Sequence, residues 1–322
     1  MTAVFDSPGN SSVALSVSGL TKRYGATTVL QDLQLRVEPG AVHGLVGMNG
    51  SGKTTMLECI LGIRPFDSGK IRVLGHAPDA LYRSEGAVVS IFDSPSLHPH
   101  LTVRQVLEHA GLLCQHPVRS PAEVEALLGI VKYSGYRIRE LSLGNRRRAS
   151  IAQALLGRPG LVILDEPFNG LDAGGVDGVL DLIARLNREE GTAFLLSSHQ
   201  LPYLERVCSH LSVLHKGRIA TSGAVSELFD AGDTRLRVRC DDVVRALTLV
   251  QDLPGVQVED TREPGVLTLR IGTCSPALIN QTLVSKGILV SELAPERPSL
   301  TSLFHAITTA DPPSVAAERG AT

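Results

Sequence analysis

The sequence predicts an α/β fold with a central parallel sheet, followed by a smaller α+β domain. Two observations predict the first part. Short apolar runs such as GLVILDEP and TAFLLSSH have the character of strands buried on both faces, and segments of helical periodicity separate them. A third observation predicts the second part, because after about Asp230 the pattern changes to strictly alternating runs and short amphipathic segments. A chain of 322 residues with 43% hydrophobic residues is long enough to bury both cores.

The expected elements of the first part begin near Val13. The runs VALSVSGLTKRY and TTVLQDLQLRVEPG alternate apolar and polar residues around a Gly-containing turn, which predicts antiparallel strands. AVHGLVG predicts a buried strand that ends in a Gly-rich turn. TTMLECILGI predicts a helix whose apolar face holds Met56, Leu57, Ile60 and Leu61. The segment from Val176 to Glu190 predicts a further helix, which we expect to cover the parallel sheet.

The C-terminal part predicts the element order β-α-β-β-α-β. TRLRVRC alternates strictly, DVVRALTLVQDL has helical periodicity, and VQVED with GVLTLRI predicts a hairpin. Ser275-Pro276 has the residues of an N-cap and a first helical position, and ILVSELAPE predicts the last strand. We find no charged cluster, ligand loop or catalytic dyad in this extension. Its sequence therefore favours a packing or dimer-stabilising role over a regulatory ligand site.

Domain boundaries follow from these patterns. We expect one domain over residues 13–230 and an accessory α+β domain over residues 233–308. Residues 1–12 and 309–322 are poor in core-forming side chains, which predicts flexible tails.

Composition excludes several functional classes. With 31 Lys and Arg against 33 Asp and Glu, the net charge of −2 removes the general attraction that nucleic-acid binders use, and we expect no nucleic-acid partner. No run approaches the roughly 18 to 20 apolar residues that span a bilayer, and the N-terminus lacks the features of a signal peptide. Five scattered cysteines without metal-site spacing predict reduced thiols. A soluble cytoplasmic chain is the expectation.

A phosphate-binding motif lies between the predicted buried strand and the predicted helix. Residues 47–54, GMNGSGKT, fit G-x-x-x-x-G-K-[ST]. The glycines let backbone N–H groups turn toward an anion, Lys53 supplies a positive charge for the β- and γ-phosphates, and the Thr54 hydroxyl can bind Mg²⁺. We expect nucleotide contacts from Gly47, Met48, Asn49, Gly50, Ser51, Gly52, Lys53, Thr54 and Thr55.

Two carboxylates stand at the end of the apolar run LVILDE. Asp165 can hold Mg²⁺ through water, and Glu166 can polarise an attacking water molecule. An acid pair at a strand end can also simply cap the next turn. The phosphate-binding motif in the same chain favours the catalytic interpretation.

Further motifs occur in the order found in the ATP-binding-cassette (ABC) ATPases. LSLGN at 141–145 opens an Arg-rich helix and resembles the LSGGQ signature. Tyr24 resembles the aromatic residue that stacks on adenine, NGLD at 169–172 resembles the D-loop, and SSH at 197–199 resembles the switch-histidine segment. The resemblance covers about residues 13–230. It implies a P-loop NTPase cassette with a RecA-like core, an antiparallel β subdomain and a helical subdomain.

The resemblance also implies a mechanism and partners. ATP and Mg²⁺ are the implied cofactors, and two cassettes, identical or similar, would face each other head to tail. Ser142, Gly144 and Asp172 of one cassette would then complete the nucleotide site of the other. Glu166 would orient water while Lys53, Mg²⁺ and His199 neutralise the developing charge. The other implied partner is a separate multi-span membrane permease, which would place the chain at the cytoplasmic face of the membrane.

Two segments depart from the usual family pattern. IFDSP at 91–95 stands where the family usually has Gln, and it resembles the I-E-S-P-S-L variant of transporters for lantibiotic-type peptides. Asp93 keeps an oxygen for Mg²⁺, so the expected metal ligands are Thr54, Asp93 and Asp165. Leu143 and Asn145 replace Gly and Gln of the signature, and Leu143 also occurs in that peptide-exporter branch.

Two further segments are an arginine run and a C-terminal motif. Arg146, Arg147 and Arg148 predict a solvated helix face. PSLTSLFHAI at 298–307 is similar to the tail of drug, polyketide-antibiotic and peptide exporter ATPases.

The function implied by the resemblance is that of an ATP-hydrolysing subunit that powers efflux of a drug, antibiotic or peptide. One alternative is a soluble ABC-type ATPase of DNA repair or translation. This alternative is disfavoured because only about ninety residues without heptads separate the phosphate loop from the signature, and the chain has a single cassette. The other alternative, motivated by Asp93 and the altered signature, is a nucleotide-binding module with weak hydrolysis.

Overall fold

The computed structural model describes residues 13–94, 97–228, 234–260, 263–272, 274–296, 300–301, 304 and 307. The chain divides into two compact units, with the division between Val225 and Ser226. The expected tails and the boundary positions 230 and 233 lie outside the described residues, as does most of the segment 298–307. No helix in the described ranges is both long and apolar enough to cross a membrane.

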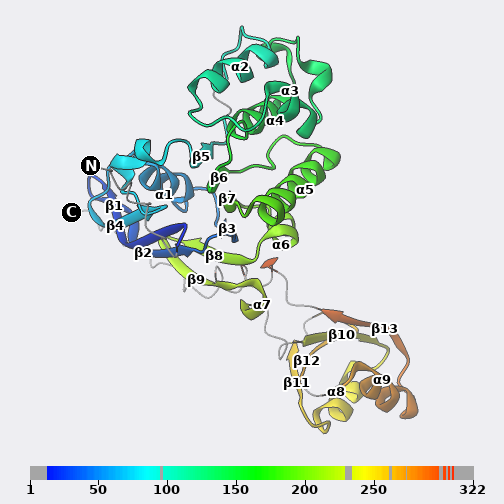
Figure 1. The fold of residues 1–322 in the computed structure, drawn as a ribbon. Helices are drawn as coiled ribbons and strands as arrows, with labels where there is room; N and C mark the ends of the chain where they lie inside the picture. The colour runs from blue at the N-terminus through cyan, green and yellow to red at the C-terminus, as the bar shows by residue number, and fades with distance from the viewer. Residues whose placement is uncertain are drawn as a thin grey trace, which may run out of the picture. The chain divides into compact units, whose positions relative to one another are not determined.

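A mainly parallel sheet forms the centre of the first unit (Figure 1). Its six strands in the described residues follow the order β5-β6-β7-β3-β8-β9. Every residue is buried in β3 (Val42–Val46), β6 (Leu161–Asp165) and β7 (Ala193–Ser198). These three strands are the apolar runs of the sequence, so the predicted parallel sheet is confirmed.

The sheet extends beyond these strands on both sides. β5 (Val88–Ile91) and β8 (His210–His215) pair parallel to β6 and β3, whereas β9 (Arg218–Ala224) pairs antiparallel to β8. The short helix α7 (Val225–Leu228) follows β9.

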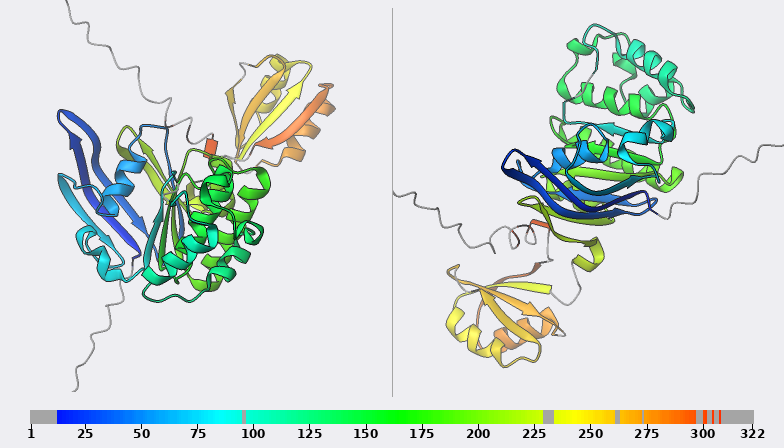
Figure 2. Two further views of the ribbon diagram at one scale, coloured as in Figure 1. Left: turned by 90° about the horizontal axis from the view of Figure 1, so that it is seen from above. Right: turned by 90° about the vertical axis from the view of Figure 1, so that its left-hand side faces the viewer.

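Helices cover both faces of the central sheet. α1 (Lys53–Ile60) lies on one side, and α5 (Ala173–Glu190) with α6 (Leu201–Val207) lies on the other (Figure 2). α1 turns Met56, Leu57 and Ile60 into the core as its apolar periodicity predicts, while Leu61 is only partly buried. This two-sided cover explains why the central strands have no polar face.

A second, antiparallel sheet in the first unit packs against α1. It has the order β2-β1-β4, from β1 (Leu15–Tyr24), β2 (Thr27–Val37) and β4 (Ser68–Val73). Leu15, Leu20 and Leu30 of this sheet share one buried core with α1 and with β6. The hairpin of β1 and β2 confirms the strand pair predicted from the alternating sequence.

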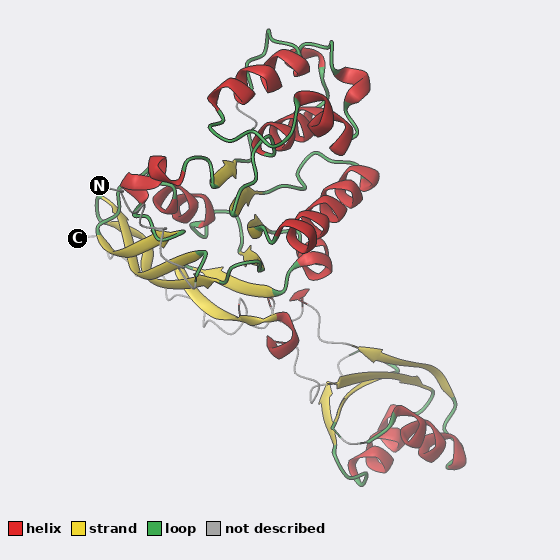
Figure 3. Ribbon diagram, viewed as in Figure 1, coloured by secondary structure: helices red, strands yellow, loops and turns green. Residues whose placement is uncertain are grey.

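A helical subdomain forms the part of the first unit without strands (Figure 3). It contains α2 (Val103–Leu113), α3 (Pro121–Leu127) and α4 (Leu143–Ala154). Short 3₁₀ turns occupy Pro78–Ser84, Val131–Tyr133 and Ile138–Glu140. α2 and α3 both begin in a capping box, at Thr102 and Ser120, which satisfies the first free N–H groups of each helix. Both helices pack on α4.

The second unit is an antiparallel sheet with two helices on one face. Its described strands, in the order β11-β12-β10-β13, are β10 (Thr234–Cys240), β11 (Val256–Asp260), β12 (Val266–Ile271) and β13 (Val290–Glu296). α8 (Val243–Gln251) and α9 (Pro276–Ser285) share a core with this sheet. The order β-α-β-β-α-β is confirmed, and the Ser275 side chain caps α9 by accepting a bond from the N–H of Leu278.

The expectation that the C-terminal α+β domain has no charged cluster is wrong. Arginine side chains at alternate positions of β10 lie beside an arginine of β12, and glutamates pair with all of them. These residues are Arg235, Arg237, Arg239 and Arg270 with Glu259, Glu263 and Glu292. Alternate residues of a strand share one face, but only the antiparallel register that places Arg235 opposite Arg270 brings the two strands' charges together.

Candidate nucleotide-binding site

A pocket of about 360 Å³ lies where β3, β6 and β7 end. Ligands of open α/β sheets bind outside these carboxyl ends. The pocket brings together residues predicted from four separate motifs: Asn49, Gly50, Gly52, Lys53, Thr54, Thr55, Asp93, Asp165, Glu166 and His199. It also includes Val29 and Asn169, which the predicted site did not contain. Val29 stands in an ordinary strand pattern with no signal of its own, whereas Asn169 begins the segment that resembles the D-loop.

The backbone of the phosphate loop depends on its glycines. A Cβ atom on Gly47 would lie 2.5 Å from Ser51 Oγ and 2.7 Å from the carbonyl oxygen of Leu214. Gly50 and Gly52 have φ values of +80° and +107°, which residues with a side chain rarely adopt. The motif therefore specifies a loop that brings its backbone close to a ligand.

Lys53 is buried at the start of α1 and contacts both the phosphate loop and Glu166. Its Nζ donates to the carbonyl oxygens of Gly47 at 2.8 Å and Met48 at 3.4 Å, and it lies 3.5 Å from Glu166 Oε1. The ammonium group is thus held by the loop at the place where a phosphate would be bound. A phosphate would offer it a stronger, charged acceptor.

Asp165 ends β6 with one oxygen bonded and the other without a partner. Thr54 Oγ1 donates to Asp165 Oδ2 at 3.0 Å. Oδ1 is buried and has no hydrogen-bond partner in the described residues. Burial, reinforced by the charge of Glu166, raises the pKa of the Asp165 carboxyl group. An orphaned carboxylate oxygen beside a threonine hydroxyl fits a divalent cation with oxygen ligands.

Glu166 is held by three polar side chains and a strained backbone. Its φ is +48°, a left-handed conformation that is unusual for glutamate and costs energy. Oε2 accepts a bond from Ser198 Oγ at 3.1 Å and lies 3.0 Å from His199 Nδ1. With Lys53 beside Oε1, the surrounding residues fix both carboxylate oxygens at the edge of the pocket. Such fixation suits a group that must orient water.

Tyr24 lies outside the pocket lining and is 42% exposed. Lys22 Nζ and the Arg64 guanidinium group lie 5.1 Å and 5.5 Å from the centre of its ring. The ring therefore offers an aromatic surface with positive charge beside it, and its contact with adenine stays a prediction.

The signature residues also lie outside this pocket. Ser142 is the exposed N-cap of α4, and its Oγ accepts a bond from the N–H of Asn145 at 3.3 Å. A Cβ on Gly144 would lie 3.1 Å from the carbonyl oxygen of Gly170, so the start of α4 packs on the D-loop-like segment. Asp172 caps α5 by accepting a bond from the N–H of Gly175 at 2.8 Å. One chain thus presents the phosphate loop and the signature at separate places.

The expectation of a solvated helix face is wrong for Arg147. Its side chain is only 1% exposed and points from α4 toward the ends of β5 and β6. Nη2 donates to Asp93 Oδ1 at 2.8 Å and to the Asp93 carbonyl oxygen, and Nη1 donates to the carbonyl oxygen of Asp165 at 3.4 Å. A run of arginines usually lies in solvent, so only the packing of α4 reveals this buried member.

The donor set near the pocket fits Mg²⁺ bound mainly through a nucleotide. Within the described ranges, no group of three or more His, Cys, Asp or Glu side chains could hold a metal. Mg²⁺ typically keeps several waters and takes one or two carboxylates plus substrate phosphates. Thr54 and Asp165 meet that need, whereas Asp93 Oδ1 already accepts bonds from Arg147 and Asn169.

Comparison with known proteins agrees with this geometry. The ABC transporter family matches residues 30–169. Over 298 residues, the chain is 31% identical to the uncharacterized ABC transporter ATP-binding protein YdbJ of Bacillus subtilis (strain 168), and the match covers 92% of this chain and 96% of that protein. The chain belongs to the ABC transporter ATP-binding proteins.

This ABC ATP-binding protein is also similar to an antibiotic-transport protein and to a solved structure. It is 28% identical to the bacitracin transport ATP-binding protein BcrA of Bacillus licheniformis, over 91% of this chain and 96% of that protein. A solved ATP-binding subunit of an ABC transporter has a TM-score of 0.61 and 26% identity, over 67% of this chain and 91% of the other. The fold class and the ATPase class of enzyme predicted from the motifs are confirmed. The roles of single residues stay predictions.

Proposed function

We propose that this ABC ATP-binding protein hydrolyses ATP to power export of a drug, antibiotic or peptide through a separate membrane permease. The observation that carries the proposal is the pocket that joins Lys53, Thr54, Asp165 and Glu166. The similarity to BcrA extends over 91% of the chain, so it includes residues beyond the ATPase core. That length of match favours a transporter of this branch over an ATPase of DNA repair or translation.

The proposed reaction begins with binding of the nucleotide phosphates at the loop. Lys53 would exchange its carbonyl partners for phosphate oxygens. Backbone N–H groups of residues 47–54 would donate to the same anion. Thr54 and Asp165 would hold Mg²⁺, which supplies positive charge for the phosphates. Adenine would contact Tyr24.

Hydrolysis would then depend on Glu166 and His199. Glu166 keeps the bond from Ser198, exchanges its contact with Lys53 for a water molecule, and orients that water toward the γ-phosphate. His199, which lies 3.0 Å from Glu166 in the described structure, would donate to the charge that develops on the phosphate.

A second cassette completes the proposed site. Ser142 and Gly144 lie outside the pocket of their own chain, and both stand at the beginning of α4, whose N–H groups favour anions. In a head-to-tail pair, these groups would reach the γ-phosphate bound by the partner. The second cassette is a copy of this chain or a similar chain.

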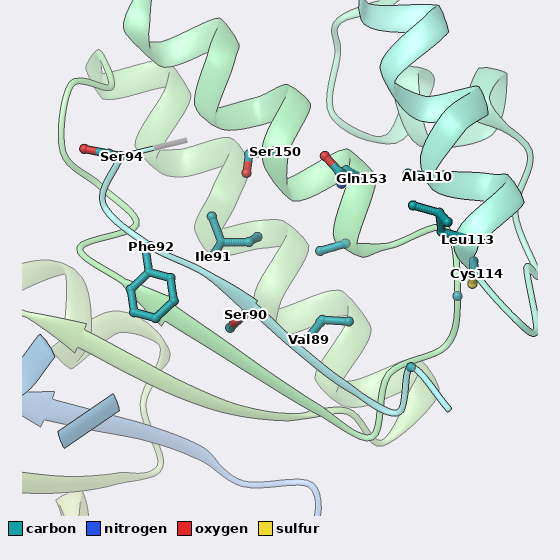
Figure 4. A pocket seen from close by; sticks show the side chains of 13 residues that line it. Val89, Ser90, Ile91, Phe92, Ser94, Ala110, Leu113, Cys114, Ser150 and Gln153 are labelled. Carbon is teal, nitrogen blue, oxygen red and sulfur yellow. The ribbon is translucent and has the colours of Figure 1, made fainter. Parts of the chain in front are cut away.

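The surface around Asp93 is the proposed contact for the permease, at the cytoplasmic face of the membrane. A pocket of about 420 Å³ lies between residues 89–94, the end of α2 and α4. Ser150 and Gln153 of α4 stand across it from Val89 and Ser90 (Figure 4). Leu113, which lines the pocket, is 85% exposed. An apolar segment of a membrane partner would cover this leucine and the pocket.

Measurement of steady-state ATP hydrolysis by the full chain tests the proposed function. Wild type should hydrolyse ATP, and Lys53→Ala should lose nucleotide binding because it loses the only charge in the phosphate loop. Glu166→Gln should bind ATP but accumulate an ATP-bound dimer, with turnover reduced about a hundredfold or more. Glu189→Gln, a surface change at the end of α5, is the matched control and should keep wild-type turnover.

Two outcomes would contradict the proposal. Unchanged turnover in Lys53→Ala would contradict the assignment of this pocket as the nucleotide-binding site. Equal, negligible turnover of wild type and Glu166→Gln in the presence of the membrane partner would favour a binding module with weak hydrolysis. The partner itself is checked by purifying the chain from membranes, where a multi-span protein should accompany it.

A further inference from the structure

Arg147 carries a buried positive charge that the proposed reaction does not use. A buried guanidinium group needs both a counter-charge and hydrogen-bond acceptors to offset the loss of water. Asp93 supplies the counter-charge through Oδ1 at 2.8 Å and a further acceptor through its backbone carbonyl. Among the described residues, Arg147 Nε is buried and has no hydrogen-bond partner, so these contacts provide most of the compensation for the buried charge. Asp93 is therefore the residue on which this charge depends.

The same Asp93 oxygen belongs to a chain of hydrogen bonds that reaches Glu166. Asn169 Nδ2 donates to Asp93 Oδ1 at 3.1 Å, and Asn169 Oδ1 accepts from Gln200 Nε2 at 3.0 Å. The Gln200 backbone N–H donates to Ser198 Oγ at 3.1 Å. Ser198 Oγ donates in turn to Glu166 Oε2 at 3.1 Å. The network thus joins α4 to the segments after β5, β6 and β7.

Arg147 also contacts the strand that carries the acid pair. Its Nη1 donates to the carbonyl oxygen of Asp165 at 3.4 Å. One rigid, planar guanidinium group therefore bridges Asp93, two residues beyond β5, and Asp165, the last residue of β6. A displacement of this group would shift both segments relative to the phosphate loop.

We propose that Arg147 is a positioning residue for ATP hydrolysis, and that Asp93 serves as its counter-ion in the network supporting Glu166 rather than as a ligand of Mg²⁺. This inference rests on the proposed function, because the network matters only if Glu166 orients the attacking water. It differs from the expectation that Asp93 binds Mg²⁺ in one measurable respect. A metal ligand affects the Mg²⁺ requirement, whereas a positioning pair affects turnover.

The test compares Asp93→Asn, Arg147→Gln and the double variant in the full chain. Each single change leaves one charge without its partner, and turnover should fall about tenfold or more because Glu166 loses its support. The double variant has two amides that can bond to each other and no unpaired charge. Its turnover should exceed that of either single variant, which is the coupling expected of a direct pair, but it should stay below wild type because the contact with Asp165 is also lost.

Two further readouts separate positioning from a general loss of structure. The Mg²⁺ concentration for half-maximal turnover should be the same in Asp93→Asn as in wild type. Binding of a fluorescent ATP analogue without Mg²⁺ should also be unchanged in all three variants, because the hydrogen bonds found for Arg147 and Asp93 in the described residues do not include the phosphate loop. Arg188→Gln, which removes an exposed arginine charge of α5, is the control and should keep wild-type turnover.

If Asp93→Asn or Arg147→Gln does not fold, Arg147→Lys tests the same proposal in its place. It keeps the positive charge but cannot bridge Asp93 and Asp165 at once, so it should fold and show lower turnover with an unchanged Mg²⁺ requirement. An Mg²⁺ requirement raised about tenfold in Asp93→Asn would overturn the proposal, as would losses that simply add in the double variant. Glu166→Gln checks the catalytic site by itself, so either result would leave that assignment standing.

Discussion

His43, the second residue of β3, is a buried histidine. Its Nε2 lies 2.8 Å from Ser212 Oγ, and its ring stacks on that of His210 with centres 6.1 Å apart. Burial, with a smaller contribution from the charge of His210, lowers the pKa of His43 from 6.5 to about 4. The native state therefore keeps this ring neutral at pH values where the unfolded chain takes up a proton.

Stability should consequently fall as the pH is lowered through this range. The contribution of His43 is complete above pH 6.5 and is lost progressively toward pH 4, because the unfolded state binds more protons between these values. The lowered pKa corresponds to a change of roughly 3 kcal/mol in the free energy of unfolding. Urea unfolding of wild type and His43→Gln at several pH values between 4 and 7 measures it.

The quantity to compare is the slope of the unfolding free energy against pH in wild type and in His43→Gln, because other groups titrate in both proteins. The slope should be smaller in His43→Gln, and His109→Gln, at an exposed position of α2, is the control. Parallel curves for wild type and His43→Gln would show that the buried imidazole does not carry this dependence.

At the scale of elements, two of the three glycines of α5, Gly175 and Gly178, have opposite surroundings. A Cβ on Gly175 would lie 2.7 Å from Asp172 Oδ1 and 2.9 Å from Arg148 Nη2. A Cβ on Gly178 would have no neighbour within 4 Å. The first glycine therefore permits the close contact of the α5 cap with α4, and the second has no packing role.

Alanine at these two positions should change stability in opposite directions. Gly178→Ala should stabilise the protein by about 0.5–1 kcal/mol through helix propensity alone. Gly175→Ala should destabilise it by about 1 kcal/mol or more, because the bond from its N–H to the Asp172 cap is disturbed. Thermal melts of both variants measure the effect. Equal stabilisation by the two alanines would mean that Asp172 and Arg148 do not constrain the helix start.

The same elements show which features the sequence pattern could predict. The phosphate loop and the Asp165–Glu166 pair are predictable because each is a contiguous motif beside an apolar strand, where local chemistry and local structure coincide. Asp93 and Arg147 stand 54 positions apart, and nothing in either segment signals the other. The arginines of β10 and β12 likewise meet only through strand register. Contacts that form only through tertiary packing therefore cannot be predicted from these patterns, although the sequence contains every residue involved.

For the whole molecule, the central question is whether one chain holds a complete ATPase site. The pocket contains the phosphate loop and Glu166, while Ser142 and Gly144 lie outside it. In the proposed symmetric head-to-tail pair, each nucleotide would contact the phosphate loop of one chain and the signature of the other. This arrangement predicts that two inactive variants can restore activity to each other.

Lys53→Ala and Ser142→Asp provide such a pair. The first disables the phosphate loop. The second keeps a good helix cap but sets a negative charge where the partner's γ-phosphate is expected, so each variant alone should be inactive. In a mixed dimer, the intact loop of one chain faces the intact signature of the other, and an equimolar mixture should recover about a quarter of wild-type turnover.

The control is a chain that carries both substitutions. Mixed with Ser142→Asp, it forms no dimer with an intact loop facing an intact signature, so turnover should stay at the level of the single variants. Recovery in that control would mean that the signature is not needed in trans. If Lys53→Ala and Ser142→Asp failed to complement while wild type still formed an active dimer, the two motifs would act within one chain and the head-to-tail arrangement would be excluded.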